Sequence, residues 1–263
     1  MDADSITNHT LSIEADSLAY LKSGTGPAVI IVHGIGGHKE DWREIMRALA
    51  SRQTVYAIDM MGFGASSKTS AEITIATQVG AISALMTAEK LEKTDLIGNS
   101  VGGWVAAQFA ATHAESTRRL VLGDAAGFEA MFEGPPPANF YPGTVEEMQK
   151  LLSLVRYSDV AHTRGFAERA LKSLEASGDA QAAERVFQGL FVSPRLEELM
   201  PKITTPTLVV WGAEDKLFPP VIANLVHGGI KGSSTVLIPK ASHFPHIDNP
   251  ESFLAAVTDF LKR

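Results

Sequence analysis

The sequence predicts an α/β protein whose sheet is mostly parallel and doubly wound, with one helical insertion. Short apolar runs alternate with longer segments of helical periodicity, as in parallel strands joined by helices. One such run, residues 28–33, is apolar up to His33 and is therefore typical of a strand buried on both faces. The alternation stops after Gly127, and residues 128–200 show helical patterns only.

The elements follow in order along the chain. A hairpin is expected over residues 11–15 and 17–22, before the buried strand. A helix is expected over residues 38–50, because Trp42, Ile45 and Leu49 recur on one helical face. The other expected strands, which bring the total to eight, span residues 54–59, 94–98, 119–123, 207–211 and 234–239. The other helices expected outside the insertion span residues 73–89, 101–113 and 250–263.

The interruption divides the chain into two expected domains. Residues 1–127 and 201–263 form the core, and residues 128–200 form a helical cap inserted after the sixth strand. Thr144 with Glu147 three positions later is a helix-start signal. Three cap helices are expected, near residues 144–157, 165–176 and 179–191.

Charge and composition exclude several functions. The formal net charge is -7 and no block of Lys or Arg occurs, so a nucleic-acid partner has no electrostatic support. The absence of cysteine excludes disulfides, thiolate nucleophiles and cysteine-based zinc sites. Residues 1–10 do not resemble a signal peptide, and no apolar segment reaches the ~18 residues that span a bilayer. A cytoplasmic protein is expected, with a processed secreted form as the alternative, and either a monomer or a homodimer fits.

The strongest local motif is Gly98-Asn99-Ser100-Val101-Gly102, which matches G-x-S-x-G. An expected strand precedes it and an expected helix follows it, which is the setting of a nucleophile elbow. The turn is so sharp that residues two positions from the serine must be small. Ser100 is therefore the candidate nucleophile.

A serine hydroxyl needs a base, and the base needs a carboxylate to fix its tautomer. His243 follows the last expected strand, and parallel strands end at one edge of a sheet, where sites form. Asp215 follows the preceding strand and is the candidate acid. His246 is the rival base, and Glu214 and Asp124 are the rival acids.

An oxyanion formed at the reacting carbonyl requires backbone N–H donors. Val101, directly after the nucleophile, is expected to supply one. Ile35, in the loop after the strand at residues 28–33, is expected to supply the other, with Gly36 as second choice. His33 is expected to support this loop through hydrogen bonds.

These motifs, together with the turn at residues 59–66, resemble the α/β-hydrolase superfamily over nearly the whole chain except the cap. The likeness is closest to the bacterial branch that holds small esterases, meta-cleavage-product C–C hydrolases, haloperoxidase-like enzymes and epoxide hydrolases. Epoxide hydrolases use an aspartate where this chain has Ser100. Asn99 resembles the C–C hydrolases, but those enzymes usually carry tryptophan where this chain has Phe244. They also use a cap arginine to hold a substrate carboxylate, and the arginines of this cap match no such motif.

The sequence therefore predicts a serine hydrolase that cleaves small or medium carboxylic esters through an acyl-enzyme. Ester cleavage is favoured over C–C or lactone hydrolysis by the same triad, and a ligand-binding protein without turnover is the remote alternative. The chemistry requires no metal or organic cofactor, and the expected partner is a small acyl substrate. Aromatic and methionine side chains of the cap are expected to line the acyl site: Phe128, Met131, Phe132, Phe140, Phe166, Phe187 and Phe191.

Overall fold

The computed structural model describes residues 5–68 and 72–262. Residues 1–4 of the expected core and Arg263 of the expected last helix lie outside this range. The chain forms an eight-stranded sheet in the order β1-β2-β4-β3-β5-β6-β7-β8. Strands β1 and β2 pair antiparallel, β2 also pairs antiparallel with β4, and all other pairs are parallel. The predicted α/β-hydrolase fold with a mostly parallel, eight-stranded sheet is confirmed.

The strands agree closely with the apolar runs of the sequence. Four of them, β3, β5, β7 and β4, are buried over all or nearly all of their length. The hairpin is longer than expected, because β1 begins at Thr7. The bounds are β1 Thr7–Ile13, β2 Asp16–Ser23, β3 Ala28–Val32, β4 Thr54–Ile58, β5 Thr94–Asn99, β6 Thr117–Gly123, β7 Thr207–Gly212 and β8 Ser234–Ile238.

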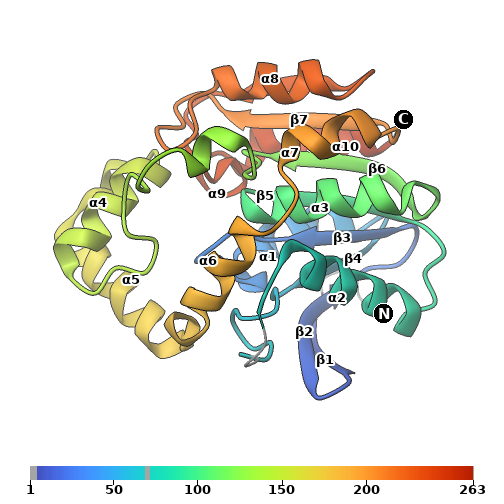
Figure 1. Ribbon diagram of the computed structural model, residues 1–263. Coiled ribbons are helices and arrows are strands. Elements are labelled where there is room, and N and C mark those ends of the chain that lie inside the picture. Colours follow the sequence, from blue (N-terminus) through green and yellow to red (C-terminus); the bar gives the residue numbers. More distant parts are fainter. Residues whose placement is uncertain (1–4, 69–71, 263) are drawn as a thin grey trace.

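Helices cover both faces of the sheet (Figure 1). Because side chains alternate along a strand, Val29 and Ile31 pack with α1 and α10, whereas Ile30 and Val32 pack with α2, α3 and α8. The bounds of these helices are α1 Arg43–Ala50, α2 Ile75–Ala88, α3 Val101–Thr112, α8 Val221–Gly229 and α10 Pro250–Lys262, and the single turn α9 spans Pro245–Asp248. No helix in the described residues is both long and apolar enough to span a bilayer.

The segment between β6 and β7 contains helices and no strand among its residues, all of which are described. Its helices α4 (Val145–Val155) and α5 (Arg164–Ser177) stand off one end of the sheet (Figure 1). They share a small apolar cluster centred on Met148, Leu152 and Ala167. Helices α6 (Ala183–Phe191) and α7 (Leu196–Leu199) lead back to the core.

Asp179, just after α5, attaches this segment to the core. Its buried carboxylate accepts hydrogen bonds from the Gly64 N–H at 3.0 Å, His38 Nε2 at 3.0 Å and Lys68 Nζ at 3.1 Å. Burial favours the neutral carboxyl, but the bonds from His38 and Lys68 outweigh burial and hold the pKa of Asp179 below its ordinary value. The hydrogen bond to Asp179 in turn raises the pKa of His38.

Asp179→Asn is expected to lower the free energy of unfolding by about 2–3 kcal/mol, because two cationic partners lose their counter-charge. The folded-state pKa of His38 lies above its unfolded value of about 6.5. The ion pair of His38 with Asp179 therefore contributes its full stabilisation below the unfolded-state pKa. This contribution is lost as the pH rises through the folded-state pKa of His38. Denaturant unfolding should show a larger difference between wild type and variant below about pH 6 than near pH 9. Asp159→Asn, at a fully exposed carboxylate, is the control, and an equal difference at both pH values would exclude a contribution from His38.

Candidate active site

Ser100 occupies a strained turn between β5 and α3. Its φ of 56° and ψ of -123° lie in a region that L-residues rarely adopt. Four backbone hydrogen bonds hold the turn: the Ser100 N–H donates to the Gly123 carbonyl at 2.8 Å, and the Ser100 carbonyl accepts from the N–H groups of Gly103 at 2.9 Å, Ala126 at 3.0 Å and Trp104 at 3.2 Å. This backbone presents the side chain at the end of β5, as the motif predicts.

The glycines of the motif are required by close backbone approach. A Cβ at Gly98 would lie 2.2 Å from the Gly102 carbonyl oxygen, and a Cβ at Gly102 would lie 2.2 Å from the Val32 carbonyl oxygen. Gly34 has a similar role, because its Cβ would lie 2.7 Å from the Ser100 Cβ. The elbow is therefore packed against the loop that follows β3.

His243 and Asp215 form a buried pair in loops after β8 and β7. His243 Nδ1 donates to Asp215 Oδ2 at 2.9 Å. The other oxygen of Asp215 accepts from the N–H groups of Leu217 at 2.8 Å and Phe218 at 3.0 Å, which fixes the carboxylate. Because Nδ1 carries the proton, Nε2 has a free lone pair and can accept a proton.

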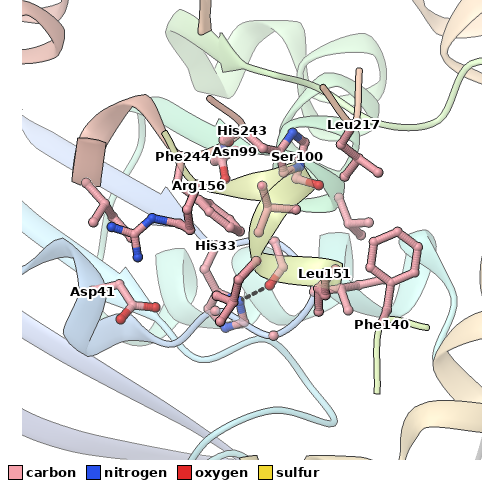
Figure 2. Close-up of a pocket in the computed structure, with 18 of the residues that line it drawn as sticks. His33, Asp41, Asn99, Ser100, Phe140, Leu151, Arg156, Leu217, His243 and Phe244 are labelled. Atoms are coloured by element: carbon pink, nitrogen blue, oxygen red, sulfur yellow. Dashed lines mark hydrogen bonds between the residues drawn. The ribbon is translucent and has the colours of Figure 1, made fainter. Parts of the chain in front are cut away.

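The structure brings Ser100 and His243 to one cavity. Both side chains line it, and Figure 2 shows the imidazole ring of His243 beside the Ser100 side chain. Asn99 connects the loop that carries His243 to the end of β6. Its amide nitrogen donates to the carbonyls of His243 at 3.1 Å and Gly123 at 3.2 Å. The three predicted side chains, far apart in sequence, thus lie together at the carboxyl edge of the sheet.

Two rival residues are engaged elsewhere. His246 is buried and stacks on the Trp42 ring with centroids 3.8 Å apart, and burial lowers its pKa to about 3. Glu214 accepts a hydrogen bond from the Ala241 N–H at 3.1 Å. In the described part of the chain, neither forms a hydrogen bond with the Asp215 side chain.

The third rival, Asp124, lies beside the predicted pair. One ligand atom each of Asp124, Asp215 and His243 can be chosen so that all three lie within 4.8 Å of one another. Carboxylates and imidazole are metal ligands in general. Here the His243 nitrogen and an Asp215 oxygen bond to each other, and Asp124 Oδ1 accepts from the Gly212 N–H.

Ile35 and Val101, the expected oxyanion donors, line the cavity beside Ser100. Within residues 5–68 and 72–262, neither backbone N–H donates to a protein acceptor. His33 supports the loop: its Nε2 accepts from the Met60 N–H at 3.0 Å, so its Nδ1 carries the proton and donates to the Gly34 carbonyl at 2.7 Å. Burial lowers the pKa of His33, which favours this neutral form.

The cavity has a volume of about 400 Å³ and is mostly apolar. Helices α4 and α5 supply much of its wall, including Leu151 and Phe166, and Phe140 faces Ser100 across the space in Figure 2. Of the seven side chains predicted to line the acyl site, Met131, Phe140, Phe166 and Phe187 do so. The other three pack against neighbouring rings instead: Phe128, Phe132 and Phe191.

Arg156 is a lining residue that the sequence did not single out. Its Nε donates to Asp248 Oδ1 at 2.9 Å, and Figure 2 shows its side chain at the opposite end of the cavity from Phe140. Arg156 is one of the arginines of residues 128–200 that match no family motif, and its bond to Asp248 of α9 holds it at the cavity. Arg164, by contrast, forms exposed ion pairs on the surface.

Comparisons with known proteins place these features in context. A family model described as alpha/beta hydrolase fold matches residues 27–250. A 2-hydroxy-6-oxo-6-(2'-aminophenyl)hexa-2,4-dienoic acid hydrolase from Metapseudomonas resinovorans is 31% identical over 93% of this chain and 87% of its own length. A pimeloyl-[acyl-carrier protein] methyl ester esterase from Aeromonas hydrophila is 29% identical over 93% of this chain and 99% of its own. The crystal structure of a bacterial membrane phospholipase A superposes with a TM-score of 0.84 at 30% identity, covering 99% of this chain and 87% of that one.

Proposed function

Because this chain belongs to the α/β-hydrolase fold family, we propose that it is a serine hydrolase that cleaves carboxylic esters of small or medium acyl groups. The supporting observation is the pairing of His243 Nδ1 with the buried Asp215 carboxylate in a cavity that also holds Ser100. That pairing leaves Nε2 free as a base at the strained serine. Burial of the pair excludes water from the bond that orients the imidazole.

The proposed reaction has two halves. His243 Nε2 takes the hydroxyl proton of Ser100 while the Ser100 Oγ forms a bond to the ester carbonyl carbon. The free N–H groups of Ile35 and Val101 bind the resulting oxyanion. The C–O bond then breaks, and the alkoxide leaves with the proton from His243. Water repeats the sequence on the acyl-Ser100, releasing the carboxylic acid and restoring the serine. Asp215 stabilises the imidazolium in both halves.

Residues 128–200 act in this proposal as a cap over the acyl pocket. The apolar wall contributed by α4 and α5 suits an acyl chain, and burial of its methylene groups contributes ~0.8 kcal/mol each. A cavity of about 400 Å³ fits a small or medium substrate.

C–C hydrolysis by the same residues is the second candidate, favoured by Arg156. Its guanidinium lines the cavity, and among the described residues only Nε of this group is hydrogen-bonded, to Asp248. The remaining donors suit an anionic group at that end of a substrate. The relative from Metapseudomonas resinovorans is named for a dienoic acid, which carries such a group.

A fluorophosphonate probe followed by intact-mass analysis tests the nucleophile. Wild type should gain one adduct, and Ser100→Ala should gain none. Labelling that persists in the variant would contradict the proposal. Parallel assays with p-nitrophenyl esters and with the ring-fission dienoic acid then separate the two candidates. Saturable binding of both without turnover would instead support a ligand-binding protein.

A further inference from the structure

Asp124, considered above only as a rival acid, is a second carboxyl group behind the predicted triad. It directly follows β6, and its side chain is completely buried. Strands β6 and β7 are neighbours in the sheet, with Gly123 opposite Val210. Asp124 therefore lies where β6 ends beside the loop that carries Asp215.

The two carboxyl groups have very different hydrogen-bond environments. Asp215 accepts three bonds, from His243 Nδ1 and from the N–H groups of Leu217 and Phe218. Asp124 accepts one, from the Gly212 N–H to Oδ1 at 2.8 Å, and its buried Oδ2 has no donor within the described residues. Donors stabilise the ionised form of a carboxyl group, so the negative charge belongs on Asp215.

Two adjacent carboxylates in a buried site cannot both ionise at ordinary cost. Among the described residues, Asp215 and His243 are the charged or titratable groups beside Asp124, and the charge of Asp248 also acts on it. Burial is the largest cause that raises the pKa of Asp124 well above its ordinary value, and the charge of Asp215 is the next. Protonation of Asp124 would also give Oδ2 a hydrogen-bond partner, because its O–H group can donate to the carboxylate of Asp215.

We propose that Asp124 is a positioning residue that holds a proton at Oδ2 and donates it in a hydrogen bond to Asp215. The proposal rests on the function proposed above, since it concerns how the acid of the triad is held. The additional hydrogen bond fixes the plane of the Asp215 carboxylate. Because protonated Asp124 is uncharged, it adds no second negative charge near His243.

Asp124→Asn and Asp124→Ala test the role in catalysis. The amide of Asn is neutral, accepts from the Gly212 N–H and donates to Asp215, so kcat/KM and the acidic limb of its pH profile should match wild type. Alanine removes the donor, and kcat should fall by up to about 10²-fold as the base loses its orientation. A pH profile of Asp124→Asn displaced by about one unit or more to lower pH would overturn the proposal, because it would show that Asp124 is an anion in wild type.

Infrared spectroscopy tests the protonation state without reference to activity. The wild-type minus Asp124→Asn difference spectrum at neutral pH should contain the C=O band of a protonated carboxyl, and its absence would overturn the proposal. Asp159→Asn, at an exposed carboxylate, should leave that region unchanged. Thermal unfolding of each variant controls for folding. Since the band does not depend on Ser100, its absence from a protein that the fluorophosphonate labels would reject Asp124 alone, whereas failed labelling would reject the proposed hydrolase.

Discussion

Ser100→Ala is expected to lower kcat for a p-nitrophenyl ester by a factor of about 10⁵, because the variant lacks the atom that forms the acyl-enzyme. The free N–H groups of Ile35 and Val101 and the apolar cavity remain, so KM should change little. The hydroxyl donates no hydrogen bond to a partner in the described chain. Alanine adopts the same strained backbone as serine, and the free energy of unfolding should stay within about 1 kcal/mol of wild type.

Steady-state kinetics with denaturant unfolding measure both quantities. Ser116→Ala is the matched control, since Ser116 precedes β6 at the opposite edge of the sheet, and its kcat should equal that of wild type. Retention of a tenth or more of the activity by Ser100→Ala would mean that another group attacks the substrate.

Much of the fold could be predicted because the buried strands are continuous apolar runs. The expected strand at residues 28–33 is β3, Ala28–Val32, and the expected strand at 54–59 is β4, Thr54–Ile58. The sequence does not indicate helix α8, which has only nine residues and ends in Gly228 and Gly229. Exposed Val221 and Leu225 also interrupt the polar face that is typical of a surface helix.

Tertiary contacts also changed one expected helix. The segment at residues 38–50 begins as a separate 3₁₀ turn, Lys39–Trp42, before α1. Buried Asp59 accepts hydrogen bonds from the Lys39 backbone N–H at 2.8 Å and from its Nζ at 2.6 Å. No local pattern in the sequence indicates this partner, which directly follows β4.

The residues of the candidate site could be predicted because each one follows an expected strand, and a residue that follows a parallel strand lies at a known edge of the sheet. Ser100, Asp215 and His243 each follow a parallel strand, and such ends share one edge. From the sequence alone, Asp124 and Asp215 are alternative candidates for the acid of the triad. The adjacency of β6 and β7 shows that both carboxyl groups lie at the same place. Arg156 could not be placed, because its orientation depends on Asp248 far along the chain.

The largest loss of stability is expected for a substitution in the nucleophile elbow, at Gly98. In Gly98→Ala, the new methyl group would lie 2.2 Å from the Gly102 carbonyl oxygen, 2.5 Å from its carbonyl carbon and 2.7 Å from the Gly103 nitrogen. All three are backbone atoms at the start of α3, whose position is fixed by the hydrogen bonds of Ser100 to Gly123 and Ala126. Overpacking that side chains can absorb costs about 1–3 kcal/mol. A clash with anchored backbone should cost at least about 3 kcal/mol, enough to unfold a marginally stable protein.

Gly80→Ala is the control that separates this clash from a general effect of replacing glycine. Gly80 lies in α2, and a Cβ there would meet nothing within 4 Å. Since alanine is the better helix former by about 0.5–1 kcal/mol, Gly80→Ala should raise the free energy of unfolding. Urea unfolding of both variants compares the two substitutions directly. If Gly98→Ala unfolded within about 1 kcal/mol of wild type and kept its activity, the serine could not depend on a turn this tight, and strain at Ser100 would have no part in presenting the nucleophile.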